Sequence, residues 1–382
     1  MRPVETVDDA AALCEPSRRP QVAALKRIHE LWMMDQAFHD AYRANPARAL
    51  AGTGLAVDPC AASILLMRRL PDGEEVPSAS DELPETFVWY QAFLEGRVRN
   101  MQRARVSNLP DDPRFRDWTL RQLRRCAREM GPRANFMGHL PLAFELSSGC
   151  SVGCPFCALS AGRLAGVFRH TEENAALWRD VLARVHAIVG DAARRSICYY
   201  ATEPLDNPDY ELFLEDFLGE LGRVPQTTTA VATRNIERTR RLLSWGQGTV
   251  AHFDRLSILS KRDFDTILSA FSPEELLFTD LLPQFSGAPA SNLLKAGRNR
   301  SADHGMEATI ACVSGFVVNM QDRSVRLVTP SVVDDGHPTG ELVYETKAFT
   351  DGESLEREIL DMIERHMHET ISLSDVLGIN QD

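Results

Sequence analysis

The chain has 382 residues, of which 44% are hydrophobic and 25% are charged. This composition is typical of a globular protein, and no apolar stretch approaches the length of a membrane helix, so we expect no membrane partner. The formal net charge of −12 argues against nucleic acid as a partner, because proteins that bind phosphate backbones carry a basic surface. The start of the chain lacks a basic segment followed by an apolar one, and we therefore expect a cytoplasmic location.

Residues 1–135 are predicted to form a helical N-terminal region. Between Gln21 and Ala49 apolar side chains recur at helical spacing, and similar patterns follow in residues 86–106 and 115–130. We find no catalytic motif in this region.

Residues 136–300 show apolar, β-like runs in alternation with amphipathic helical patterns. Such alternation predicts βαβ units around a parallel sheet, and so an α/β fold in the form of a barrel or part of one. Residues 301–382 are predicted to add a β-hairpin, from two apolar runs joined by "QDRS", and an amphipathic helix. The β-like runs of the middle region are residues 140–147, 195–204, 226–235, 252–260 and 276–285.

Three cysteines follow directly on the first β-like run. The segment "SSGCSVGCPFCALS" (residues 147–160) contains Cys150, Cys154 and Cys157 in a C-x3-C-x2-C pattern. Parallel α/β sheets and barrels carry their chemistry at this end of the strands. Three thiolates on one loop can bind three irons of a [4Fe–4S] cube and leave the fourth iron open, while Gly149 and Gly153 let the backbone direct N–H groups toward sulfur.

Two other cofactors use cysteines in related ways. A structural zinc ion needs four ligands in paired spacing, and the nearest candidate for the fourth, His170, lies beyond a predicted loop. An electron-transfer cluster needs a fourth cysteine, and the next one is Cys198. The segment therefore favours a cube with one open iron. The remaining cysteines are scattered and are predicted to be reduced thiols rather than a disulfide framework.

Cys150, Cys154, Phe156 and Cys157 match the cysteine motif of the radical SAM superfamily, including the aromatic residue before the last cysteine. The chain resembles this superfamily over residues 140–285. The resemblance implies a partial (β/α)6 TIM-like barrel, one [4Fe–4S] cluster, and S-adenosyl-L-methionine (SAM) as co-substrate. In such enzymes the reduced cluster cleaves SAM, and the 5′-deoxyadenosyl radical that forms removes hydrogen from an unactivated C–H group.

The resemblance also implies where SAM would be bound. In "YYATEP", Ala201 and Thr202 replace the two glycines of the superfamily segment that binds the methionyl amino group, whereas Glu203 and Pro204 remain. The departure keeps the carboxylate and alters the backbone contacts. The side chains that would contact the ribose and carboxylate, which could equally be core or solvent-facing residues, are Thr233 or Arg234, and Ser257.

The stretches that flank the core, residues 31–59 and 312–349, are similar to the proteusin-type radical SAM peptide epimerases of ribosomal peptide (RiPP) maturation. This similarity implies L-to-D epimerisation in a ribosomally made precursor peptide with a leader, and flavodoxin or ferredoxin as the external one-electron reductant. The N-terminal region would then handle the peptide or its leader, or act as a lid. Residues 301–382 would complete the substrate site. No cysteine-rich tail follows the core, which disfavours peptide maturases with auxiliary clusters.

Epimerisation needs a hydrogen donor on the face of Cα opposite to the one that loses hydrogen, and a thiol suits this role. Cys312, in "ACVSGF", is the first candidate because it lies in the segment most like the epimerases. Cys198 is the second, although its place in "SICYYATEP" also fits a packed strand. Two alternatives remain: another radical modification of a peptide, such as backbone excision or crosslinking, and a catalytically silent Fe–S protein that binds a leader.

Overall fold

The computed structural model describes residues 13–67, 83–107, 109–246 and 253–368, and the chain divides into two compact units. The first unit combines residues 1–104 with residues 226–293, and the second combines residues 105–225 with residues 294–382. Each unit is described by itself, and the three consecutive regions expected from the sequence remain a prediction. Within the described ranges, no helix is both long and apolar enough to span a bilayer.

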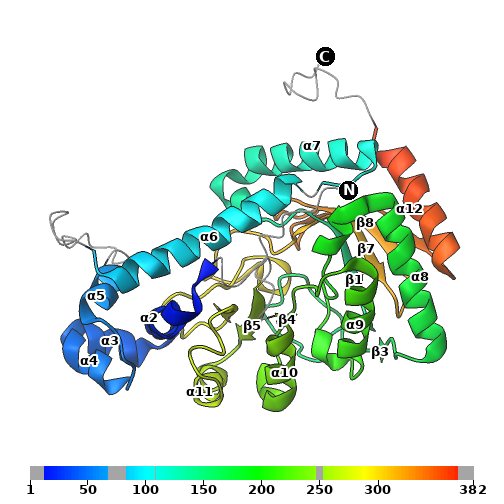
Figure 1. The fold of residues 1–382 in the computed structure, drawn as a ribbon. Helices are drawn as coiled ribbons and strands as arrows, with labels where there is room; N and C mark the ends of the chain where they lie inside the picture. Colours follow the sequence, from blue (N-terminus) through cyan, green and yellow to red (C-terminus); the bar gives the residue numbers. More distant parts are fainter. Residues whose placement is uncertain (1–12, 68–82, 108, 247–252, 369–382) are drawn as a thin grey trace, which may run out of the picture. The chain divides into compact units, whose positions relative to one another are not determined.

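The first unit holds a series of helices and a three-stranded parallel sheet in the order β4–β5–β6. Helices α10 and α11 connect these strands in sequence, as the predicted alternation requires (Figure 1). Strand β4 is much shorter than the run predicted at residues 226–235. The elements are η1 (Pro16–Arg18), α2 (Arg19–Met34), α3 (Gln36–Ala44), α4 (Pro46–Gly52), α5 (Pro59–Met67), α6 (Glu85–Ser107, which continues into the second unit), β4 (Thr228–Thr229), η5 (Ala232–Arg234), α10 (Ile236–Gly246), β5 (Asp254–Ile258), α11 (Lys261–Ala270) and β6 (Thr279–Pro283).

The second unit holds a mixed sheet in the order β1–β7–β8–β9. Strand β1 pairs with β7 in parallel, and β7, β8 and β9 are antiparallel neighbours. Helix α7 contacts β7, α12 contacts β8 and β9, and α8 packs against α9 and α12 (Figure 1). The elements are α7 (Pro113–Met130), η2 (Gly131–Phe136), β1 (Leu140–Glu145), β2 (Ser147–Ser148), β3 (Gly166–Val167), α8 (Glu172–Val189), η3 (Gly190–Arg195), η4 (Pro204–Asp206), α9 (Tyr210–Leu221), η6 (Gly297–Asn299), β7 (Val313–Asn319), β8 (Ser324–Pro330), β9 (Glu341–Ala348) and α12 (Gly352–His366).

Strand β1 is buried along its whole length. All six residues from Leu140 to Glu145 are buried. On the helical side, the Phe144 ring meets Trp178 of α8 edge to face, with 4.9 Å between ring centres, and the Trp178 indole N–H donates to the carbonyl of Phe213 in α9 at 3.0 Å. A strand that is buried on both faces has a continuous apolar sequence, and this apolar run is what predicted β1.

The predicted C-terminal hairpin is confirmed as β7 and β8, and the structure extends it by a strand that was not predicted. The residues of β9 are exposed or only partly buried, and charged side chains interrupt its apolar ones. Such a strand at the edge of a sheet carries no apolar run by which sequence reasoning could find it. Helix α12 confirms the predicted C-terminal helix up to His366, and the end of that prediction lies outside the described residues.

The strand predicted at residues 195–204 is not formed. Only Ile197 pairs, with Ala143 of β1, in an isolated parallel bridge. The chain bends after Ile197, and further on the N–H of Ala201 donates to the Glu145 carboxylate at 3.0 Å. The structure therefore establishes an α/β fold, and a partial barrel of six strands is not shown.

A buried ion pair crosses the sheet of the second unit. The Arg326 guanidinium, from β8, donates to the two oxygens of Glu145 at 3.1 and 3.2 Å. The side-chain amide of Asn319 also donates to this carboxylate at 3.2 Å, and Glu145 is only 2% exposed. Burial acts to lower the pKa of Arg326, but Glu145, with help from Glu341 and Tyr200, outweighs it and the pKa is raised. The pair thus supplies charge compensation inside the sheet.

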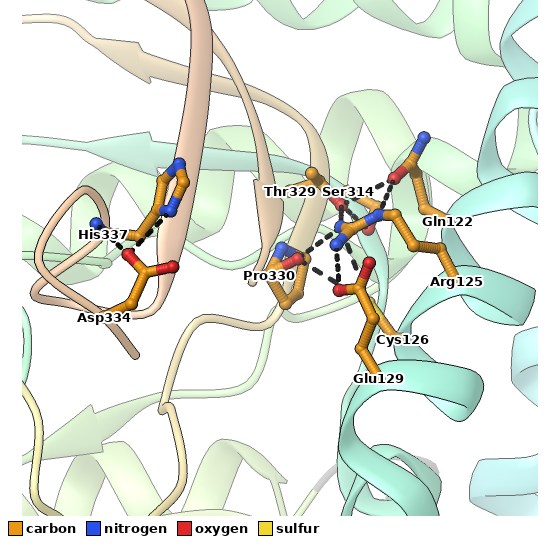
Figure 2. A network of polar contacts seen from close by, with 9 residues as sticks. All are labelled: Gln122, Arg125, Cys126, Glu129, Ser314, Thr329, Pro330, Asp334 and His337. Carbon is orange, nitrogen blue, oxygen red and sulfur yellow. Dashed lines mark hydrogen bonds and ion pairs between the residues drawn. The ribbon is translucent and has the colours of Figure 1, made fainter. Parts of the chain in front are cut away.

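A second polar network joins α7 to the end of β8 (Figure 2). The Arg125 guanidinium donates to the carbonyl of Pro330, donates to the side chain of Gln122 at 2.9 Å, and pairs with Glu129 at 2.6 Å. The thiol of Cys126 lies 3.6 Å from the same carbonyl oxygen of Pro330. Burial raises the pKa of Cys126 to about 11, so this cysteine stays protonated and serves as packing.

We expect Glu145→Leu to lower the free energy of unfolding by about 3 kcal/mol, because the Arg326 guanidinium is then buried without its partner. Adding Arg326→Met should restore part of this loss, since the buried guanidinium is gone while Asn319 and Ala201 still lack their acceptor. Urea unfolding of the wild type, the single variant and the double variant measures both effects. A double variant no more stable than the single one would contradict this account of the pair.

Candidate functional site

The three predicted ligand cysteines lie on an excursion between β2 and β3. These two short strands pair antiparallel, so residues 149–165, which we call the cysteine loop, leave and return at the same place. The buried side-chain amide of Asn207 donates to the carbonyl of Leu146 at 3.0 Å and to that of Phe168 at 2.7 Å. One side chain therefore fastens both ends of the loop to the sheet.

Gly149 determines how the cysteine loop leaves β2. Its φ is 77°, and a Cβ at this position would lie 2.1 Å from the carbonyl oxygen of Arg163. Only glycine permits this approach, which lets the Cys150 N–H donate to the carbonyl of Gly162 at 3.0 Å. Gly153 also has a positive φ of 64°, but among the described residues nothing lies within 4 Å of a Cβ built there.

The sulfurs of the cysteine loop are partly exposed, and two of them already receive backbone N–H groups. The N–H of Val152 points to Sγ of Cys150 at 3.4 Å, and the N–H of Ala161 points to Sγ of Cys157 at the same distance, 3.4 Å. Hydrogen bonds of this kind stabilise the thiolates that bind iron–sulfur clusters and adjust the cluster potential. Cys150 and Cys157 thus each have a backbone N–H donor beside the sulfur.

The three thiols are close enough to influence one another. The pKa of Cys154 is raised to about 11, first by burial and then by the nearby sulfurs of Cys157 and Cys150. Burial also raises the pKa of Cys150, to which the carboxylates of Glu203 and Asp206 add while backbone N–H groups oppose. Because thiolates are the metal ligands, a metal or cluster must displace protons when it binds here.

The donor set consists of three thiols on one loop, and the sulfurs of Cys157 and Cys150 lie close enough to Cys154 to add to the effect of burial on its raised pKa. Each cysteine ligand of a [4Fe–4S] cube binds a different iron, so a cube needs sulfurs that are near one another but separate. The alternative zinc ligand, His170, pairs instead with Asp216 of α9 at 2.9 Å. The residues present therefore fit a cube with three protein ligands.

Two carboxylates lie beside Cys150. Glu203 precedes η4, and its buried carboxylate accepts the N–H of Leu205 at 3.1 Å. The carboxylate of Asp206 accepts the backbone N–H of Ser151 at 2.7 Å and also the Ser151 hydroxyl. The turn that begins at Glu203 is thereby attached to the cysteine loop, with the Glu203 carboxylate beside Cys150.

The other predicted SAM contacts in the second unit differ in their exposure and in the hydrogen bonds that they already make. The N–H of Ala201 is occupied by Glu145 at 3.0 Å, so this backbone donor points into the protein. Thr202 and Phe156 are partly exposed, whereas Pro204 is buried. Glu203 supplies the one carboxylate of the "YYATEP" segment, and its role as a SAM contact stays a prediction.

Cys312 is a partly exposed thiol at the edge of the sheet core. It directly precedes β7 and packs, as do Leu159 of the cysteine loop and Ala201, against a buried cluster that includes Tyr200. The N–H of Leu140 donates to its carbonyl at 2.8 Å. Because β1 and β7 are parallel, Cys312 lies where β1 begins and the cysteine loop follows its other end, about 17 Å along a six-residue strand.

Cys198, the second candidate donor, lies in a different environment. It is 1% exposed, and burial holds the pKa of its thiol well above the usual range, so no substrate can reach it. Tyr200 lies two residues further on, and its hydroxyl donates to the carboxylate of Glu341. Burial raises the pKa of Tyr200, and Glu341 and Cys312 add to this, which places the Cys312 thiol near the Tyr200 ring.

Thr233, Arg234 and Ser257 belong to the first unit and are described there alone. The Thr233 hydroxyl donates to Asp263, at the start of α11, at 3.4 Å. Arg234 is exposed, and Ser257 is partly buried in β5. Their role as SAM contacts stays a prediction.

Sequence reasoning missed three residues that hold the cysteine loop: Asp206, Asn207 and Arg298. The first two follow directly on "YYATEP", and a pair of polar residues after a motif was a usable signal. Arg298 gave no such signal, because it lies 144 residues after Cys154, to whose carbonyl it donates at 2.9 Å.

We expect Gly149→Ala to remove most cluster binding, because the new Cβ would collide with the Arg163 carbonyl and force the cysteine loop apart. Gly153→Ala is the matched control: it has the same unfavourable positive φ, worth about 1 kcal/mol, without a collision. Iron and sulfide per chain after anaerobic reconstitution measure the difference. Equal loading of the two variants would show that the close approach at Gly149 is dispensable.

Comparisons with known proteins place the chain in a family. No protein-family model matches it. The crystal structure of BtrN in complex with AdoMet and 2-DOIA is similar with a TM-score of 0.35 and 16% identity, over 49% of this chain and 71% of BtrN, a level that does not establish a shared fold. The uncharacterized protein y4wI of Sinorhizobium fredii (strain NBRC 101917 / NGR234) is 34% identical over 378 residues, which cover 93% of this chain and 72% of y4wI. The chain therefore belongs to the same family as y4wI.

Proposed function

We propose that the chain is a radical SAM enzyme that converts L-residues of a ribosomally made precursor peptide to D-residues. One observation carries the proposal. A loop with three cysteines is fastened at one end of β1, and a further partly exposed thiol, Cys312, lies at the other end of the same strand. The first feature suits a cluster with an open iron, and the second suits a hydrogen donor.

Cys150, Cys154 and Cys157 would hold the [4Fe–4S] cluster, and Glu203 would bind the amino group of SAM. When bound, these cofactors supply a 5′-deoxyadenosyl radical that removes hydrogen from an unactivated C–H bond, after an electron arrives from a flavodoxin or ferredoxin. What remains for the chain is to hold one peptide residue at the site, to exclude water, and to return a hydrogen atom.

Cys312 would return that hydrogen. Its S–H bond breaks homolytically, the hydrogen atom bonds to the planar Cα, and a thiyl radical stays on Sγ. One electron from an external reductant and one proton from solvent restore the thiol. Inversion requires that hydrogen be removed and returned on opposite faces of Cα.

The surroundings of Cys312 suit radical chemistry. The cluster against which it packs is built of apolar side chains, which keep water from a reactive sulfur. Tyr200 is the polar exception, and its hydroxyl is engaged by Glu341. Cys312 is thus partly exposed, while the side chains packed behind it are mostly apolar.

We expect the reconstituted protein to form 5′-deoxyadenosine from SAM under dithionite without oxygen. Replacing Cys150, Cys154 and Cys157 together by alanine should abolish this, because no cluster is then held. Chromatographic detection of 5′-deoxyadenosine is the measurement. A wild-type protein that binds the cluster but forms none would favour a silent leader-binding protein instead.

We expect Cys312→Ala to keep SAM cleavage but to lose formation of D-residues in a co-expressed precursor peptide. In D2O the wild-type product should carry one deuterium per inverted residue, from the exchanged thiol, and in H2O its mass should be unchanged. Cys198→Ala is the control and should behave as the wild type. D-residues with solvent deuterium in Cys312→Ala would exclude this donor, and a product of altered mass would point to excision or crosslinking.

A further inference from the structure

A turn from the C-terminal part of the second unit lies against the cysteine loop. In η6, the backbone N–H of Arg298 donates to the carbonyl of Cys157 at 3.0 Å. The guanidinium of Arg298 donates to the carbonyl of Cys154 at 2.9 Å and to that of Ala161. Although Arg298 is largely exposed, one residue thus satisfies three carbonyl groups of the loop, and two of these belong to predicted cluster ligands.

Gly297 allows the turn to come this close. Its φ is 56°, and a Cβ here would lie 2.4 Å from the carbonyl oxygens of both Cys157 and Ala158. Any larger residue would push the turn away from the cysteine loop and would withdraw Arg298 with it.

The turn is held in place by contacts that do not involve the cysteine loop. The N–H of Gly297 donates to the carbonyl of Pro338 at 2.7 Å, and the side-chain amide of Asn299 donates to the carbonyl of Leu294 at 2.9 Å. Ala296, just before the turn, is fully buried. The cysteine loop therefore rests on a support that is fixed independently of it.

We infer that Arg298, presented by Gly297, is a positioning residue for the cluster. It holds the backbone of Cys154 and Cys157 in the ligating arrangement and places a positive charge beside the site. The inference rests on the proposed function for the identity of the cluster. Hydrogen bonds from a charged donor are stronger than those between neutral groups. The guanidinium bonds to Cys154 and Ala161, together with the backbone N–H bond to Cys157, therefore hold these parts of the cysteine loop in place. A nearby positive charge also favours the reduced, more negative cluster and raises its reduction potential.

The test compares variants of the reconstituted holoenzyme. Arg298→Ala should lose iron to a chelator about tenfold faster than the wild type, as expected for the loss of charge-assisted hydrogen bonds. Its reduction potential, followed by EPR, should become more negative. Arg298→Lys keeps the positive charge but cannot make both guanidinium hydrogen bonds to Cys154 and Ala161. It should therefore lose iron faster than the wild type yet retain a reduction potential near that of the wild type.

Arg300→Ala is the matched control, because Arg300 lies in the same segment but donates to Asp335 and to the carbonyl of Asp334 rather than to the cysteine loop. It should leave both iron release and potential unchanged. Unchanged values in Arg298→Ala, or equal changes in Arg300→Ala, would overturn the inference.

A second measurement needs no iron and separates the two proposals. In cofactor-free protein, amide hydrogen exchange of residues 154–161 should be faster in Arg298→Ala and in Gly297→Ala than in the wild type, while thermal unfolding stays cooperative. If the wild type binds no cluster, the proposed function fails, and faster exchange in the variants still supports the positioning role. Equal exchange in all three proteins overturns that role even where the cluster forms.

Discussion

The parallel pairing of β1 with β7 is the constraint on which the candidate site depends. The pairing aligns Leu140 with Val313 and, after an irregularity between Leu140 and Leu142, Glu145 with Asn319, although the two strands are far apart in the sequence. Every residue of both strands is buried, so this pairing lies within the core of the second unit. The same register fixes Cys312 at one end of the pair and the start of the cysteine loop at the other.

The cysteine loop is shaped by contacts with its backbone more than by packing of its side chains. Gly149 lets its two limbs meet, Asn207 fastens its ends, Asp206 binds the turn after Cys150, and Arg298 supports its last part. These groups come from the loop itself and from two other parts of the second unit. Protein side chains and carbonyls thus supply the order that a bound cofactor would otherwise have to impose.

The sequence predicted the elements that carry a strong apolar pattern and missed those that do not. Strand β1, the hairpin and the amphipathic helices follow from periodicity, and the cysteine motif follows from spacing. Residues 195–204 are apolar enough for a strand, but the chain bends after Ile197, and the N–H of Ala201 donates to the Glu145 carboxylate. Strand β9 is polar and lies at an edge. Arg298 and Arg326 act only through the fold, since their partners lie far away in the chain.

The amide of Asn207 has a consequence for the order of assembly. It joins Leu146, just before β2, to Phe168, just after β3, so protein hydrogen bonds hold together the two limbs that carry the cysteine loop. Under the proposed function, ligation of a cluster would therefore not be the step that brings these limbs together. A chain that lost such a cluster to oxygen would keep the same hydrogen bonds and could be reloaded.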